Sequence, residues 1–250
     1  MSNSEILIYE DDDLLVLNKP SGLPSAPLPK NREERTAVQL AIEIFPDLPT
    51  RFPPDSFEPG LLHRLDTGTS GLLAFAKSPE AFAHFRSVWK SEEVRKVYRA
   101  IAPILAQEFE GSMGKPISPY LAHDAKSSKR MRAFLGPKAP IKVRGKLLPT
   151  WTQIERVEAL TSNFRSPERY ADWQISIRTG VMHQIRCTLA WLKCPIVGDL
   201  IYRGAASDRL WLHAWRLQIP CKNEQILHIE APLPENWPGS DFRIASAGLP

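Results

Sequence analysis

Residues 171–178, ADWQISIR, alternate strictly between hydrophobic and polar side chains. Ala171, Trp173, Ile175 and Ile177 therefore share one face, as alternate residues do in a β-strand. Other segments carry hydrophobic runs of the length and composition of strands. These predicted strands are residues 6–8, 14–17, 71–78, 94–105, 150–160, 211–219 and 225–231.

Three segments combine helical periodicity with recognisable ends. Thr36 and Gln39 have the spacing of a capping box before a hydrophobic stripe. Ser78 followed by Pro79 is typical of an N-cap and a first helical position. Residues 20–59 hold nine prolines and predict mostly loop around the first helix, because proline removes a backbone donor. The predicted helices are residues 36–45, 78–90 and 182–193.

The order of these elements predicts the fold class. Strands are interrupted by helices without a regular repeat, and no low-complexity linker divides the chain. This order is typical of the α+β class with a mixed or largely antiparallel sheet. The 250 residues are enough for one sizeable core. We therefore expect a single domain over residues 1–250.

Composition excludes several classes of protein. The chain is 43% hydrophobic and 24% charged, as ordinary globular proteins are. No hydrophobic run approaches the ~20 residues of a membrane helix. The acidic N-terminus does not match a secretory signal, so we expect a cytoplasmic location. Three cysteines without CxxC spacing indicate neither a disulfide framework nor a metal site. The sequence has no phosphate loop or dinucleotide fingerprint, and we expect no cofactor.

Positive charge gathers in one short segment. The net charge of +4 permits a polyanionic partner without requiring one. Residues 126–132, KSSKRMR, contain Lys126, Lys129, Arg130 and Arg132 with few acidic residues close by. Composition alone favours a solvated loop, and the alternative is a loop that contacts phosphates.

Asp66 lies in a glycine-rich stretch between two hydrophobic segments, HRLDTGTSG followed by LLAFA. Gly68 and Gly71 allow the backbone to turn tightly there, and a simple Asx-turn would suit the pattern. The letters DTG also occur in the signature of aspartic proteases. Those enzymes need two carboxylates that share a proton. The chain has no second DTG and no DSG, which leaves a homodimeric protease as the alternative function.

His183 and Arg186 are three residues apart on one face of the third predicted helix. This face differs from the hydrophobic stripe of Met182, Ile185, Leu189 and Leu192. A cation in the first turn opposes the helix dipole and costs roughly 0.3–1 kcal/mol. A carboxylate partner from another element would offset this cost, either as an ordinary salt bridge or as part of a functional site.

Four motifs follow one another along the chain: HRLDTGTSG at 63–71, KVYRA at 96–100, MHQIR at 182–186 and LHAWRL at 212–217. In this order, and with DDDLLVLNKPSGLP at 11–24, they resemble the RluA-type family of pseudouridine synthases. The resemblance implies isomerisation of a uridine in RNA to pseudouridine without a cofactor. It also implies a bent, mixed and largely antiparallel sheet flanked by helices, with a central cleft. The expected partner is a structured rRNA or tRNA, with no membrane involved, and we expect a monomer.

The resemblance also implies roles for individual residues. Asp66 is implied to be the catalytic residue, Tyr98 to lie against the target base, and Arg186 to pair with the catalytic carboxylate. Arg64 is implied to help displace the base from the RNA stack. Lys19 stays open between a direct role and the ordering of the active-site wall. Further RNA contacts are expected from His63, His183, Lys126, Lys129, Arg130 and Arg132.

Two features depart from the family pattern. Gly180, Val181 and Met182 stand where the family usually has Gly-Arg-Thr, so one basic contact is missing. By the resemblance the chain starts directly in the catalytic core, and we expect no separate N-terminal RNA-binding domain. An RNA-binding relative without catalysis is a further alternative, against which the intact Asp66, Tyr98 and Arg186 argue.

Overall fold

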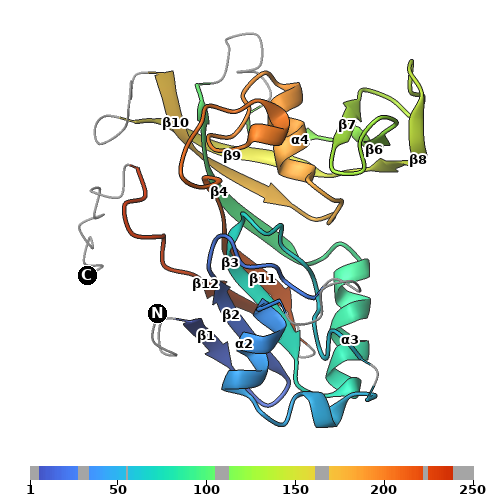
Figure 1. Ribbon diagram of the computed structural model, residues 1–250, viewed down its shortest axis with the longest axis vertical. Helices are drawn as coiled ribbons and strands as arrows, with labels where there is room; N and C mark the ends of the chain where they lie inside the picture. The colour runs from blue at the N-terminus through green and yellow to red at the C-terminus, as the bar shows by residue number, and fades with distance from the viewer. Residues whose placement is uncertain are drawn as a thin grey trace.

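The computed structural model describes residues 6–27, 34–54, 56–104, 113–160, 169–221 and 225–238. Within these ranges one sheet has nine strands, in the order β1-β2-β3-β11-β4-β10-β9-β5 with β12 paired to β11 (Figure 1). Its strands are β1 Leu7–Glu10, β2 Leu14–Lys19, β3 Ser70–Ala76, β4 Arg95–Pro103, β5 Pro116–Ile117, β9 Thr152–Ala159, β10 Tyr170–Ile177, β11 Leu212–Pro220 and β12 Ile226–Glu230. The pairing of β3 with β11 is parallel and the other described pairings in this sheet are antiparallel. The predicted α+β class with a mixed, largely antiparallel sheet is confirmed.

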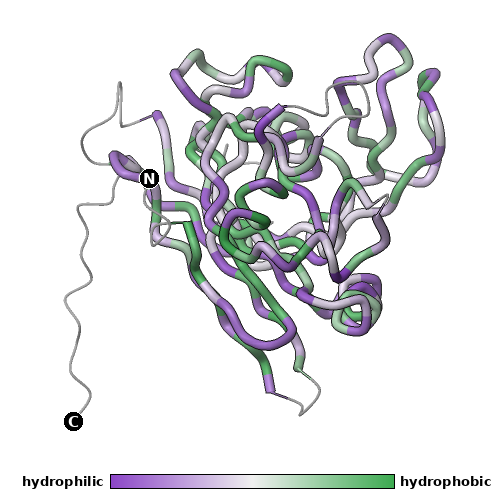
Figure 2. Tube along the Cα trace, turned by 60° about the horizontal axis from the view of Figure 1, so that its bottom comes forward, coloured by the Kyte–Doolittle hydropathy of each residue, from purple (hydrophilic) through white to green (hydrophobic). Residues whose placement is uncertain are grey.

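Both faces of β2 and β3 are buried, which explains their continuous hydrophobic runs. Alternate residues of β2 and β3 belong to two different hydrophobic clusters. Leu15 and Phe75 pack in the cluster that includes Val38 of helix α2, Ala37–Ile44. Leu14 and Leu72 pack in the cluster that includes α3, Pro79–Lys90. Figure 2 shows hydrophobic stretches along the inner strands and hydrophilic ones at the surface turns.

The two helix starts predicted from capping residues are confirmed. Gln39 accepts a hydrogen bond from the Thr36 backbone N–H at 2.7 Å, the half of the capping box that forms here. Ser78 Oγ accepts from the Ala81 N–H at 3.1 Å at the start of α3. These bonds satisfy backbone donors that the first turn of a helix leaves without partners. No helix among the described residues is long and hydrophobic enough to span a membrane.

Helix α4, Gln184–Trp191, starts two residues later than predicted. Gln184 starts it with a buried side chain whose Oε1 accepts from the Thr179 hydroxyl and the Val181 N–H. His183 before it has φ 53°, a left-handed conformation that ends helical continuity. Met182 therefore lies outside the helix and is 39% exposed, so its predicted place in the hydrophobic stripe is wrong.

The second sheet has three strands, in the order β7-β6-β8, and was not predicted. Its strands are β6 Tyr120–Asp124, β7 Met131–Phe134 and β8 Val143–Pro149. Most of β8 is exposed, so it lacks the hydrophobic alternation that marks a strand in sequence. The predicted basic loop at 126–132 is the turn of the β6–β7 hairpin, and its last two residues belong to β7.

Candidate active site

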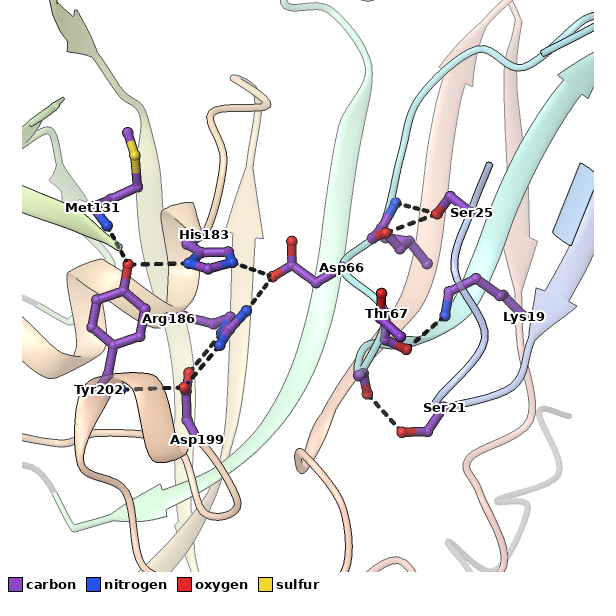
Figure 3. A network of polar contacts seen from close by, with 12 residues as sticks. Lys19, Ser21, Ser25, Asp66, Thr67, Met131, His183, Arg186, Asp199 and Tyr202 are labelled. Carbon is purple, nitrogen blue, oxygen red and sulfur yellow. Dashed lines mark hydrogen bonds and ion pairs between the residues drawn. The ribbon is translucent and has the colours of Figure 1, made fainter. Parts of the chain in front are cut away.

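Asp66 lies on a turn that is fastened to the segment following β2. The Ser25 hydroxyl donates to the Leu65 carbonyl at 2.8 Å and accepts from the Leu65 N–H at 2.9 Å. The Ser21 hydroxyl donates to the Gly68 carbonyl at 2.7 Å (Figure 3). Leu65, next to Asp66, and Gly68, two residues beyond it, are thus held by side chains 40 and 47 residues earlier in the chain. The Asp66 side chain therefore projects from a turn whose backbone is held in place by these hydrogen bonds.

Lys19 is the most deeply buried support of the same turn, with no exposed surface. Its ammonium donates to the carbonyls of Pro20, Leu23 and Thr67 at 2.9, 2.7 and 3.2 Å. Burial lowers the pKa of Lys19, and the charge of Asp66 offsets only part of this effect, so the resulting pKa is about 7. Three carbonyl acceptors match the three donors of an ammonium. Among the described residues, these contacts favour the second of the two roles considered for Lys19, which is to order the backbone beside Asp66 rather than to act directly.

Arg186 joins Asp66 to a second carboxylate. Its Nη1 donates to Asp66 Oδ2 at 2.8 Å, across 120 residues of sequence. Its Nε and Nη2 form a two-pronged pair with Asp199 at 2.6 and 2.8 Å. The Asp199 side chain is fully buried, whereas that of Asp66 is 26% exposed. Burial alone lowers the pKa of Arg186, but the hydrogen bonds and charges of Asp199 and Asp66 raise it above its ordinary value.

The two oxygens of the Asp66 carboxylate have different surroundings. Oδ2 takes the bond from Arg186 and lies 3.7 Å from Nε2 of His183. Oδ1 accepts no hydrogen bond from the residues that the structure describes. An anionic oxygen held by its neighbour yet open on one side can act on a substrate atom.

Tyr98 lies within the electrostatic reach of Asp66. It sits on β4, opposite Ile175 of β10 and Ala214 of β11. Burial and the charge of Asp66 both raise the pKa of Tyr98, so its hydroxyl stays protonated. The structure thus pairs Arg186 with the carboxylate, as the resemblance implies, and places His183 beside it. The contact of Tyr98 with a base and that of His183 with RNA stay predictions.

His63 and Arg64 are held by other contacts. The His63 ring stacks on Trp89 of α3 at 5.6 Å, and its Nε2 accepts from the Ala74 N–H at 3.2 Å. Burial lowers the pKa of His63 to about 3, so the imidazole is neutral. Arg64 pairs with Glu58. The packing of His63 argues against its predicted RNA contact, because a neutral ring packed on a helix offers little to a phosphate.

The basic side chains in the turn of the β6–β7 hairpin differ in exposure and in ion pairing. Lys126 and Lys129 are exposed. Arg132 instead donates to the buried Asp124 at 2.5 Å. The Lys126 backbone N–H and then the Arg132 hydrogen bond lower the pKa of Asp124. The sequence prediction overlooked this acid, and Arg132 is a support of the turn rather than a free phosphate ligand.

Asp199 and Tyr202 complete the site and were not predicted; both lie in the segment VGDLIY, residues 197–202. Asp199 Oδ1 accepts from the Tyr202 N–H at 3.4 Å, so the spacing alone predicts no more than a cap on a short turn. The contact of Asp199 with Arg186 depends on packing, which the sequence does not express. Among the described residues, no cluster of His, Cys, Asp and Glu could hold a metal ion.

A carboxylate on a glycine-rich turn, paired with an arginine from a distant helix, agrees with the motifs that suggested a family. Residues 13–191 match the RNA pseudouridylate synthase family, and the chain belongs to it. Ribosomal large subunit pseudouridine synthase D of Borreliella burgdorferi is 30% identical over 217 residues, covering 85% of this chain and 60% of the relative. The protein of that name from Yersinia pestis is 29% identical over 248 residues, covering 92% and 67%. The chain thus spans 60% to 67% of the length of these relatives.

Solved structures confirm the fold. Human RNA Pseudouridylate Synthase Domain Containing 1 superposes with a TM-score of 0.65 at 21% identity, covering 94% of this chain and 86% of that one. Human RNA Pseudouridylate Synthase Domain Containing 4 gives a TM-score of 0.65 at 22% identity, covering 93% and 90%. At these identities the likeness concerns the architecture of the chain.

Proposed function

We propose that the protein is an RNA pseudouridine synthase that isomerises a uridine of ribosomal RNA in the cytoplasm, acting as a monomer through a single catalytic domain. The names of its relatives refer to the large ribosomal subunit, which favours rRNA over tRNA as the substrate. The observation that carries the proposal is the Asp66 carboxylate, held by Arg186 at Oδ2 and open at Oδ1.

The chemistry suits this arrangement. Pseudouridine formation breaks the bond from uracil nitrogen to ribose, turns the base, and joins it again through carbon. One ionised carboxylate must face the sugar, as a nucleophile or as a base, and a charge-assisted bond from a nearby cation fixes its position. Arg186 supplies this cation, and its two hydrogen bonds to Asp199 hold the guanidinium in place. Neither an electron carrier nor a group donor takes part in the isomerisation.

The base has to leave the RNA stack before it can turn, at a cost of a few kcal/mol. We assign Tyr98 to the face of the displaced base, because aromatic stacking contributes roughly 1–3 kcal/mol per base. We assign Lys126, Lys129 and Arg130 to phosphate contacts, since such contacts supply most of the affinity that does not depend on sequence.

The two alternatives are less favoured. In an aspartic protease two carboxylates share one proton. Here Asp66 and Asp199 share the guanidinium of Arg186 instead. An inactive RNA-binding relative would have no need to keep Asp66 paired and partly exposed.

The direct test is Asp66→Asn, which keeps the shape and removes the charge. Purified wild-type protein should form pseudouridine in ribosomal RNA isolated from cells that lack the gene, and the variant should not. Both should melt at similar temperatures, because the Asp66 side chain is partly exposed. Pseudouridine formation by Asp66→Asn at the wild-type rate would refute the assignment.

A further inference from the structure

Tyr202 lies where the β6–β7 hairpin meets the helix that carries Arg186. It ends the short helix η4, Leu200–Tyr202, and only 5% of it is exposed. Its side chain belongs to a small hydrophobic cluster with Leu121, Met131 and Cys187. Figure 3 shows Tyr202 on the same side of Asp66 as His183 and Arg186, with Lys19 on the opposite side.

The Tyr202 hydroxyl has two hydrogen-bond neighbours of different kinds. It accepts from the Met131 backbone N–H at 2.9 Å and lies 3.2 Å from Nδ1 of His183. Because the backbone N–H can only donate, the proton of the hydroxyl is available to Nδ1. In a neutral His183, Nδ1 then accepts and the ring proton is on Nε2, which lies 3.7 Å from Asp66 Oδ2.

The protonation states agree with this chain of contacts. Burial raises the pKa of Tyr202, so the hydroxyl keeps its proton. Burial lowers the pKa of His183, although the charge of Asp66 raises it, so the imidazole is neutral near pH 7. The Cys187 thiol is the competing acceptor. Burial raises the pKa of Cys187 to about 12, and a neutral thiol accepts weakly.

The Tyr202 ring also contacts two cations of the site. The guanidinium of Arg130, on the basic hairpin, lies 5.7 Å from the ring centroid. That of Arg186 lies 5.6 Å from the same centroid. Both distances are within the range of cation–π attraction. The ring therefore contacts an arginine of the proposed RNA-binding turn and the partner of the catalytic carboxylate.

We propose that Tyr202 is a positioning residue that joins the basic hairpin to the catalytic centre. Its hydroxyl holds the start of β7 through Met131 and orients the His183 imidazole toward Asp66. His183 needs such support, because its left-handed backbone is sparsely populated by residues with side chains. This inference rests on the proposed function, in which Asp66 is the catalytic group.

Tyr202→Phe tests the inference, because it removes the hydroxyl and keeps the ring that contacts the two arginines. With saturating enzyme and a single turnover, we expect the rate constant of pseudouridine formation to fall roughly three- to tenfold, the effect of one hydrogen bond. The dissociation constant for RNA should stay at the wild-type value. Tyr9→Phe is the matched control, since its hydroxyl bonds to the exposed Asp11 and should not affect the rate.

His183→Asn is the second variant, and it also serves if Tyr202→Phe does not fold. Asparagine tolerates the left-handed conformation and cannot reproduce the imidazole bridge. This variant should lose rate while the bond between Tyr202 and Met131 remains. Adding Tyr202→Phe to it should cause no further loss, because the tyrosine acts through the histidine.

Several results would overturn the inference. The first is a wild-type rate of pseudouridine formation in Tyr202→Phe or in His183→Asn. The second is a double variant whose loss of rate equals the two single losses combined. The third is a change confined to the melting temperature and the affinity for RNA. Failure of the proposed function is distinguishable from these outcomes. In that case wild-type protein itself forms no pseudouridine, whereas an active wild type with an unaffected Tyr202→Phe rejects only the role of the tyrosine.

Discussion

Replacing Arg186 with methionine should reduce both stability and activity, for different reasons. Methionine fills much of the space of the arginine stem but has no donor. Asp199, which is fully buried, then loses both bonds of its two-pronged pair. Leaving one member of a buried ion pair without its partner costs about 3–5 kcal/mol, so the free energy of unfolding should fall by that amount.

The loss of activity comes from the other end of the same guanidinium. Asp66 loses the bond from Nη1 at 2.8 Å. A hydrogen bond between charged groups contributes about 1.5–3 kcal/mol. If that stabilisation is expressed in the transition state, the rate constant should fall roughly 10- to 100-fold. A single variant therefore cannot separate a functional arginine from a structural one.

Arg186→Met combined with Asp199→Asn separates the two effects. The second change removes the buried charge, and the asparagine oxygen can still accept from the Tyr202 N–H. The double variant should recover part of the lost stability without any of the lost activity. Arg35→Met is the control for a surface pair, because Arg35 and Glu43 are exposed, and it should cost at most about 1 kcal/mol.

The measurements are urea unfolding with a constant slope, which reports stability, and single-turnover rates of pseudouridine formation. Recovery of activity together with stability in the double variant would show that Arg186 serves the fold alone. An Arg186→Met variant as stable as wild type would contradict the buried pair with Asp199.

Three further predictions follow from the geometry. Changing Lys126 and Lys129 to alanine should lower the slope of log affinity for RNA against log salt by roughly 0.7–0.9 each, as salt titrations of binding would show. Burial lowers the pKa of Lys19 to about 7 from 10.5, so between these pH values the unfolded chain binds the additional proton. Wild-type stability should therefore rise across that window relative to Lys19→Met, and urea unfolding at several pH values measures it. Gly71→Ala should cost more than ~1 kcal/mol, since φ is +108° and a Cβ would lie 2.2 Å from a carbonyl oxygen of β11. Gly136→Ala, with open space around it, should not lower the melting temperature.

The sequence predicted those elements whose signals are local. Ser78 caps α3 because a serine before a proline suits a helix start, whatever surrounds it. Residues 171–178 alternate because successive side chains of β10 point to opposite faces of its sheet, with Trp173 and Ile175 in the hydrophobic core. The exposed β8 has no such signal, and its place beside β6 follows from pairing across the second sheet.

The site was predictable to the extent that motifs mark it. The pairing of Asp66 with Arg186 was expected from the resemblance, and the structure shows the contact. The resemblance gave no role to Asp199, because a single aspartate on a short turn is compatible with many partners. Met182 was misplaced for a similar reason, since periodicity cannot show that His183 leaves the helical conformation.

The geometry of the Asp66–Arg186 pair depends on two separately supported halves. The Asp66 turn is held by Lys19, Ser21 and Ser25, whereas Arg186 is held by Asp199 on the opposite side of the carboxylate (Figure 3). A charged pair whose members have independent supports keeps its geometry only while both supports are intact. Loss of either support misplaces the reacting oxygen without removing a phosphate contact. Damage to these buried supports should therefore reduce the rate of the chemical step more than the affinity for RNA, the reverse of damage to the basic turn.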